Sequence, residues 1–264
     1  VKDSGLYICL LEASGSNITV SNSTATSVTS GVGQYEIGIN KADFEGLSLE
    51  YSDSDSAYAD YKHSVDYDGI AHSLIVALAN GCGATWNDGN IVLPDGSILN
   101  VTYKYTLNAH NGETVEGTVT DAGSYTAFAE FEFVLDNGNY NLPEELISSI
   151  DIWQKVIENV TFEMQYQDAD GEWKKVVGDN PFENNVYTRK GFRVVALSSD
   201  FVTGDDVTIT MFIDGDFDGD YPVNVGEYTA YCDNLGGEKA SCYVLGSDLP
   251  NQEFNISKAT HDID

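Results

Sequence analysis

The stretch Asp121-Ala-Gly-Ser-Tyr125 is followed by Thr-Ala-Phe-Ala-Glu-Phe-Glu-Phe133, in which two rows of side chains alternate in polarity. A period of two residues places one row on a buried sheet face and the other toward water. Residues 101–107 and 207–213 alternate in the same way, and 16 Tyr and 11 Phe suit strands. The sequence therefore predicts an all-β fold.

The pattern Asp/Asn-x-Gly-x-Tyr recurs three times and places Tyr7, Tyr125 and Tyr228 at its end. Its Asp or Asn accepts local backbone hydrogen bonds, and its Gly permits unusual backbone angles. Its Tyr is expected to pack inward while the hydroxyl reaches back to the backbone, as in the tyrosine corner of immunoglobulin-like sandwiches. Recurrence at the spacing of a small domain predicts tandem immunoglobulin-like β-sandwich domains in an elongated array.

The chain resembles the tandem Ig-like repeats, of the MBG and YDG type, of bacterial cell-surface proteins and adhesins. That family has a Tyr-Asp-Gly turn, a strand ending in Ser-Leu, an Asp-Ala-Gly-x-Tyr-Thr corner and an Ile-x-Lys-Ala join. These elements correspond here to Tyr67-Asp68-Gly69, Ser73-Leu74, residues 121–126 and Ile256-Ser257-Lys258-Ala259. The resemblance covers residues 41–264 in outline, but a second Tyr-Asp-Gly turn is lacking and the units are longer than the family's compact form.

Four segments follow from these repeats. Residues 1–40 are expected to hold the C-terminal strands of an incomplete Ig-like unit. Residues 41–152 and 153–257 are each expected to form an Ig-like β-sandwich, and 258–264 the first strand of a following unit. Partial units expose sheet edges, which predicts either more chain on both sides or a neighbouring molecule that supplies strands.

The charge is strongly acidic, with 43 Asp and Glu against 12 Lys and Arg and a formal net charge of -31. Such a field disfavours nucleic acid and anionic membranes, because both carry the same sign. No apolar run approaches the roughly 20 residues of a membrane-spanning helix. The excess of acidic residues is explained by a solvated surface in an extracellular medium. The more specific interpretation is that some of these carboxylates bind divalent cations.

A candidate calcium loop carries carboxylates at every second position, at Asp214, Asp216, Asp218 and Asp220. This resembles the start of an EF-hand loop, although Val225 stands where a bidentate carboxylate is needed. Turn chemistry in a hairpin connection explains the same residues. Calcium is thus the one candidate cofactor.

Cysteine spacing predicts a disulfide between Cys232 and Cys242, which flank a turn-rich stretch, with free thiols as the alternative. Cys9, two residues after a corner tyrosine, and Cys82 have no assigned partners. No Cys-x-x-Cys or Cys/His cluster indicates zinc.

Five Asn-x-Ser/Thr sequons provide glycosylation candidates, a number close to chance for this composition. They lie at Asn17, Asn22, Asn100, Asn159 and Asn255.

Catalytic motifs are lacking: there is no nucleophile elbow, phosphate-binding glycine loop or His-Glu-x-x-His. Asp and Glu are so frequent that a glycosidase-like pair of carboxylates could be drawn almost anywhere, so such pairs do not indicate catalysis. His72 is expected on a strand surface, Trp86 in a loop, and Leu142–Ile147 in a loop or single turn before a strand.

These features predict a non-enzymatic extracellular segment, a stalk or fibre-forming adhesive array on a cell surface. Its partners would be other copies of itself, neighbouring domains, glycans or surface proteins. One alternative is a filament or sheath subunit completed by strand donation between molecules. The other is a carbohydrate-binding or accessory module of a secreted enzyme, with Trp86 as a sugar-stacking residue.

Overall fold

A computed structural model describes residues 3–12, 32–51, 64–108, 114–183 and 185–259. Their regular elements are all strands, apart from one 3-10 helix, η1 (Ala240–Cys242). The all-β prediction is confirmed. Residues 142–145 form an irregular segment before a strand, as expected, whereas Leu146 and Ile147, expected in the same loop, begin that strand. No helix among the described residues has the length and apolar character to cross a bilayer.

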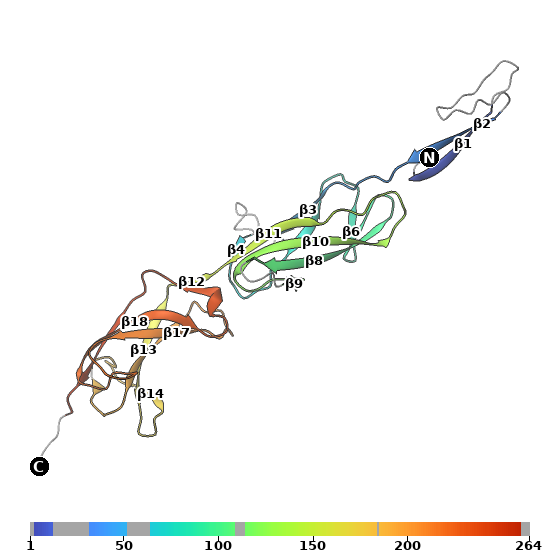
Figure 1. Cartoon of the computed structure of the whole chain (residues 1–264). Coiled ribbons are helices and arrows are strands. Elements are labelled where there is room, and N and C mark those ends of the chain that lie inside the picture. Colours follow the sequence, from blue (N-terminus) through green and yellow to red (C-terminus); the bar gives the residue numbers. More distant parts are fainter. Residues whose placement is uncertain (1–2, 13–31, 52–63, 109–113, 184, 260–264) are drawn as a thin grey trace, which may run out of the picture. The chain divides into compact units, whose positions relative to one another are not determined.

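The strands are numbered in chain order, and Figure 1 labels those for which there is room. The first are β1 (Gly5–Glu12), β2 (Val32–Ile39), β3 (Leu47–Tyr51), β4 (Ser64–Asp66), β5 (Leu74–Leu78), β6 (Thr85–Asn87), β7 (Asn90–Val92), β8 (Ile98–Leu107), β9 (Thr114–Glu116), β10 (Gly123–Leu135) and β11 (Leu146–Trp153). The others are β12 (Lys155–Ile157), β13 (Val160–Gln167), β14 (Trp173–Lys175), β15 (Asn185–Val186), β16 (Phe192–Ser198), β17 (Thr208–Asp214), β18 (Gly226–Gly236), β19 (Tyr243–Leu245) and β20 (Gln252–Ser257).

The chain divides into two compact units. The first comprises Val1–His63, His72–Val119 and Tyr125–Ile150, and the second comprises Ser64–Ala71, Thr120–Ser124 and Asp151–Asp264. The predicted boundaries assign 64–71 and 120–124 to the 41–152 sandwich, whereas the structure groups both segments with the second unit. Hydrogen bonds and ring contacts from these segments to residues 202–243, described below, explain the grouping.

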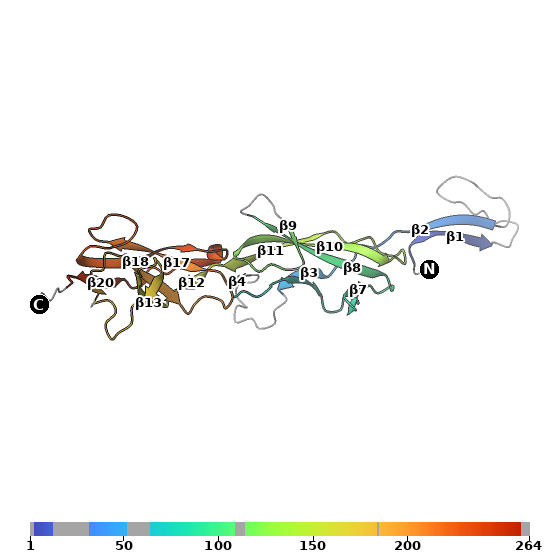
Figure 2. The same ribbon diagram turned by 90° about the horizontal axis from the view of Figure 1, so that it is seen from below.

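The first unit is built on a sheet in which β10, β8, β7 and β6 are successive neighbours. β8 and β10 pair antiparallel along most of their length, and β1 and β2 form a separate two-stranded ribbon (Figure 2). A two-stranded sheet of β3 and β5 contributes Leu47, Leu49 and Val76 to the core. The phenol oxygen of Tyr105 accepts the N–H of Leu74 at 2.7 Å and so connects β5 to β8.

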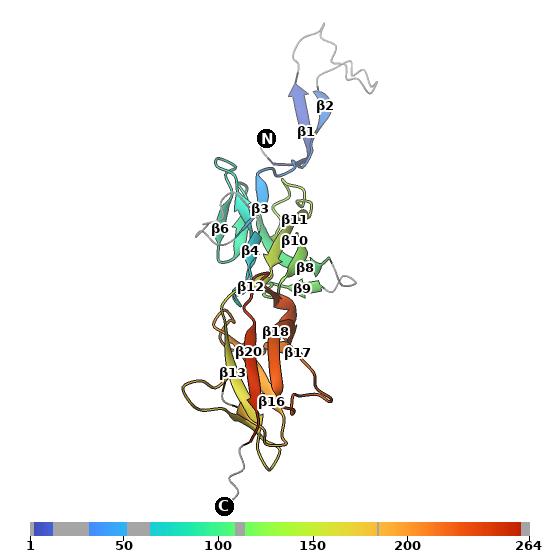
Figure 3. The same ribbon diagram turned by 90° about the vertical axis from the view of Figure 1, so that its left-hand side faces the viewer.

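The second unit contains a seven-stranded sheet in the order β14-β13-β16-β17-β18-β20-β15. Figure 3 labels β13, β16, β17, β18 and β20 of this sheet. Its core joins Met164 of β13 with Phe254 and Ile256 of β20, near the other edge. The sheet is therefore curled around one apolar interior. The last pair, β15 and β20, runs parallel, as do β12 and β19.

One hydrogen-bonding scheme occurs at two places in the chain. β4 pairs parallel with β11 and β15 with β20, and the residue after each short strand donates its N–H to the longer partner. Tyr67 donates to the Trp153 carbonyl at 2.8 Å, and Tyr187 to the Ser257 carbonyl at 2.9 Å. This equivalence comes from backbone geometry, because the two turns share no Tyr-Asp-Gly sequence.

Candidate functional site

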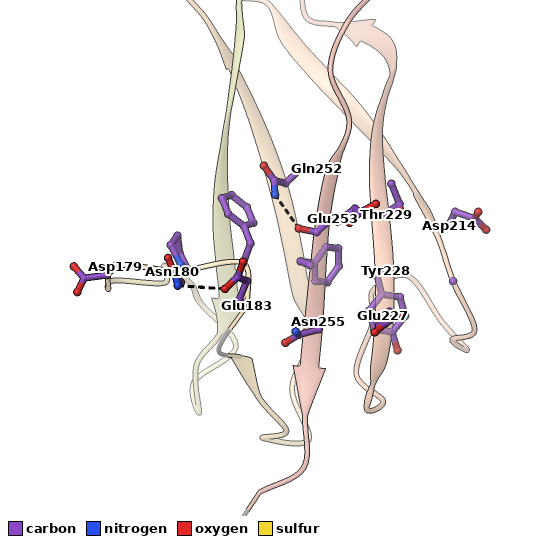
Figure 4. A pocket seen from close by; sticks show the side chains of 14 residues that line it. Asp179, Asn180, Glu183, Asp214, Glu227, Tyr228, Thr229, Gln252, Glu253 and Asn255 are labelled. Carbon is purple, nitrogen blue, oxygen red and sulfur yellow. Dashed lines mark hydrogen bonds between the residues drawn. The ribbon is translucent and has the colours of Figure 1, made fainter.

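An open cleft of about 680 Å³ lies along β18 and β20 of the second unit (Figure 4). Tyr228 and Phe254 line it together with several polar side chains. Its five carboxylate-bearing residues are Asp179, Glu183, Asp214, Glu227 and Glu253. Because no Lys, Arg, His or Cys is among the described lining residues, the cleft is suited to a cationic group.

Some of the polar groups that line this cleft are hydrogen-bonded to residues close to them in sequence. Asn180 donates from Nδ2 to Glu183 at 3.2 Å, and Gln252 donates to the Glu253 carbonyl at 2.8 Å (Figure 4). The Oδ1 atom of Asn255 is buried and, among the described groups, accepts no hydrogen bond. Within the described part of the chain, no three His, Cys, Asp or Glu side chains gather as a metal site would require.

The candidate calcium loop connects β17 to β18, the hairpin position that its alignment indicated. Gly215 has φ of +148°, and a Cβ there would lie 2.3 Å from Cδ1 of Tyr228. The loop backbone thus lies directly on this ring, and Phe217 packs on the same ring at a centroid distance of 6.0 Å. The side chains of Asp214, Asp216, Asp218 and Asp220 are exposed, and calcium binding by them stays a prediction.

Tyr228 has the contact expected of a corner tyrosine. It is 3% exposed, and its hydroxyl donates to the Asn224 carbonyl at 2.9 Å. Burial, then the nearby Asp216 carboxylate, raises the pKa of this phenol. Tyr125 is buried as well, whereas the Tyr7 side chain lies outside the described features. The positions two residues later are buried alanines, Ala127 and Ala230.

A cluster that the sequence did not reveal joins two phenols to one carboxylate. Tyr67 and Tyr243 are each 2% exposed and lie edge to face, with ring centroids 5.3 Å apart. Both hydroxyls donate to Oδ2 of Asp205, at 2.8 and 2.7 Å respectively. Tyr243 also accepts the Val202 N–H at 2.8 Å.

Burial and the Asp205 hydrogen bond shift both phenols in the same direction. Desolvation first and Asp205 second raise the pKa of Tyr243 to about 12, and they raise that of Tyr67 as well. Both phenols therefore keep their protons at neutral pH and remain able to donate to Asp205. The Tyr-Asp-Gly turn pointed to Tyr67, but no local pattern marked Asp205 or Tyr243.

A second, shallow groove of about 460 Å³ lies between the start of β13 and the end of β16. Asp200 lies beside it and accepts the backbone N–H groups of Asn159 and Glu158 at 2.7 and 2.8 Å. These bonds, with Asn159 first, lower the pKa of Asp200. The Asn159 side-chain amide also donates to Oδ1 of Asp200 at 3.0 Å, so the asparagine of this sequon is already hydrogen-bonded.

The other sequons are distributed over different environments. Asn100 is half-buried on β8, and Asn255 has the buried Oδ1 noted above. Asn17 and Asn22 lie outside the described residues. Glycosylation at any of the five stays a prediction.

The predicted disulfide is not formed, because Cys232 and Cys242 both carry free thiols, as does Cys82. Cys232 lies within β18, opposite Met211. Cys242 ends η1 and is fully buried, and its Sγ accepts the Ala122 N–H at 3.5 Å. Burial raises the pKa of both thiols, and nothing is described for the side chain of Cys9.

The predicted environments of His72 and Trp86 were both wrong. His72 is 6% exposed rather than on a surface, and its N–H donates to the Val119 carbonyl in a backbone bridge. Trp86 belongs to β6 rather than to a loop and is 42% exposed. Stacking of Trp86 on a sugar stays a prediction.

Comparison with known proteins identifies no relative: no family model, curated protein or solved structure matches the chain.

Proposed function

We propose that the chain is a non-enzymatic structural and adhesive segment, a stalk or fibre-forming array of immunoglobulin-like domains on a cell surface. The observation that carries this proposal is the hydrogen-bonding scheme found at Tyr67 and again at Tyr187. A scheme built twice in one chain favours a series of similar modules, each packed around its own core.

Charge and side-chain placement support the same proposal. A net charge of -31 keeps extended molecules apart and soluble in an extracellular medium. Phe212 and Tyr231 are 55% and 40% exposed, with ring centroids 6.4 Å apart, on neighbouring strands β17 and β18. An exposed aromatic pair is a suitable contact for a glycan or a surface protein.

A filament or sheath subunit is the second candidate. It is favoured by β1 and β2, which pair with each other as a two-stranded sheet in the described chain. Such a ribbon has backbone edges on which a strand of another molecule can pair. The mass of the native polypeptide separates the candidates, because a stalk needs further modules whereas a subunit assembles at about this size.

Antibodies against the chain test the location on intact cells of the source organism. We expect immunogold label on the cell exterior or its appendages, removed when protease is added outside. Label that appears only after the cells are permeabilised would refute the proposal. A matched antibody against a cytoplasmic protein controls for leakage.

A further inference from the structure

Val186, Tyr187 and Val225 form an exposed apolar surface where β20 ends, which we call the Tyr187 surface. Their exposed fractions are 46%, 36% and 45%. They come from the two neighbours of the β20 end, because Gly226 of β18 and Asn185 of β15 pair with Ile256 from opposite sides.

The corresponding position in the other copy of the scheme is covered. Tyr67 follows β4 as Tyr187 follows β15, yet Tyr67 is 2% exposed against 36% for Tyr187. Asp205 and Tyr243 provide the cover, through the shared carboxylate and the edge-to-face ring contact. The two tyrosines thus share backbone geometry and differ in what lies over them.

The turns after these tyrosines support the equivalence. Gly69 has φ of +77°, and Arg189 has φ of +64°, two residues beyond Tyr67 and Tyr187 respectively. Five residues beyond each tyrosine, a backbone N–H donates to a distant carbonyl: His72 to Val119 at 2.7 Å, and Phe192 to Pro222 at 3.0 Å. Left-handed backbone angles are uncommon for Arg, so their recurrence at this place marks the same turn.

The three Asp/Asn-x-Gly-x-Tyr corners also differ in whether a residue distant in sequence contacts them. In the corner at Asp121, the N–H of Ala122 donates to Sγ of Cys242, and Asp121 pairs with Lys239. In the corner at Asp3, the N–H of Ser4 donates to Oδ1 of Asn139. Val225 holds the equivalent place before Tyr228 and is exposed. Two corners therefore meet a residue distant in sequence, and the third presents a bare apolar side chain.

We infer that the Tyr187 surface is a docking site for a module of the same build as the second unit, placed after Ser257 in the same polypeptide. Its loop carboxylate and phenol would receive Tyr187 as Asp205 and Tyr243 receive Tyr67. This inference rests on the proposed function and adds the surface that one module presents to the next.

Arg189 limits the size of the side chain that the docking module can place against this turn. A Cβ on Gly69 would lie 2.7 Å from Cγ1 of Val202, so the occupant has a residue smaller than Val facing Arg189. Arg189 and Lys190 closely follow Tyr187 in sequence, and Lys258 follows Ser257, whose carbonyl accepts the Tyr187 N–H, in a chain with only 12 basic residues. An acidic module like this one is complementary to them in charge.

The test appends a second copy of residues 154–257 to Ser257 of the chain. The appended copy carries Val202→Ala, which removes the γ carbons that would meet Arg189, and Tyr187→Phe, which makes the original Tyr187 unique. Nitration of tyrosine, quantified by mass spectrometry, reports access to each phenol. We expect Tyr187 to react about tenfold more slowly than in the unextended chain, because reaction then requires local opening.

Two controls accompany this measurement. Tyr231 is 40% exposed and should react in the extended chain as it does in the parent. Asp205→Ala in the appended copy should return Tyr187 to the parent rate.

Two results would overturn the inference. The first is a folded appended copy, with Tyr243 protected, beside a Tyr187 that reacts at the parent rate. The second is a concentrated solution of the unextended chain that protects Tyr187 by itself, since the occupant is then a separate molecule. Neither result bears on the proposed location at the cell surface. That proposal fails if immunogold labelling appears only after the cells are permeabilised.

Discussion

The Tyr67 hydroxyl donates a 2.8 Å hydrogen bond to Oδ2 of Asp205, across 138 residues of sequence. Tyr243 donates to the same oxygen at 2.7 Å. One carboxylate thereby connects the segment Ser64–Ala71 to the loop that carries Asp205 and to Tyr243 of β19 within the second unit.

Replacing Tyr67 with Phe removes one of these donors and leaves the ring packing in place. Hydrogen bonds to a carboxylate contribute about 1.5–3 kcal/mol, so we expect the free energy of unfolding of the second unit to fall by about that amount. Urea denaturation measures the change. Tyr231→Phe, on an exposed ring, is the matched control, and equal effects of the two substitutions would contradict the role of the cluster.

Alkaline pH should unfold the second unit through the same phenols. The pKa of Tyr243 is raised to about 12 in the folded chain, from an ordinary value of about 10. Above pH 10 the unfolded chain has therefore lost a proton that the folded chain retains. The stabilisation is complete below about pH 10 and decreases as the pH rises toward 12.

Thermal denaturation at a series of pH values measures this decrease. Tyr243→Phe should flatten it between about pH 10 and pH 12, because the substituted side chain does not ionise. An unchanged slope in this variant would assign the alkaline transition to other groups.

Gly215→Ala places a Cβ 2.3 Å from the Tyr228 ring, at φ of +148°. Gly178 has nearly the same angle, +152°, with nothing within 4 Å of the added atom, so Gly178→Ala is the matched control. Overpacking costs about 1–3 kcal/mol, and we expect Gly215→Ala to exceed its control by that amount in urea denaturation. Equal costs would mean that only the backbone angle matters at Gly215.

Alkylation should distinguish the thiols of the native chain. Cys242 is fully buried and burial raises its pKa, so we expect iodoacetamide to modify it more slowly than the half-buried Cys82. In denaturant the two should react at similar rates. A disulfide-linked peptide containing Cys232 and Cys242, found without reductant, would contradict the free thiols described above.

Local patterns predicted the parts of the molecule that depend on neighbouring residues. Alternation identified β10 and β17, and the Asn224–Tyr228 pattern identified a buried phenol whose hydroxyl bonds four residues upstream. Turn residues placed Asp214–Asp220 in a hairpin connection. Each of these features is determined within a few residues of chain.

Features that depend on distant residues were missed. His72 is buried and bridges through its backbone to the distant Val119, and the Asp205 cluster needs Tyr67 from far upstream. Cys232 and Cys242 are close in sequence, but one lies within a strand and the other is buried at the end of η1. The sequence spacing of two cysteines does not show where their side chains point or how deeply each is buried.

Gly69 and Arg189 share a left-handed backbone, but only Gly69 is crowded by a neighbouring side chain, Val202. A saturation library of both codons would therefore give unequal results: almost every replacement at residue 69 should be depleted, while residue 189 should accept Asn, Lys or Gly. Mutational tolerance at this bend is set by what packs on it and not by the torsion angle alone.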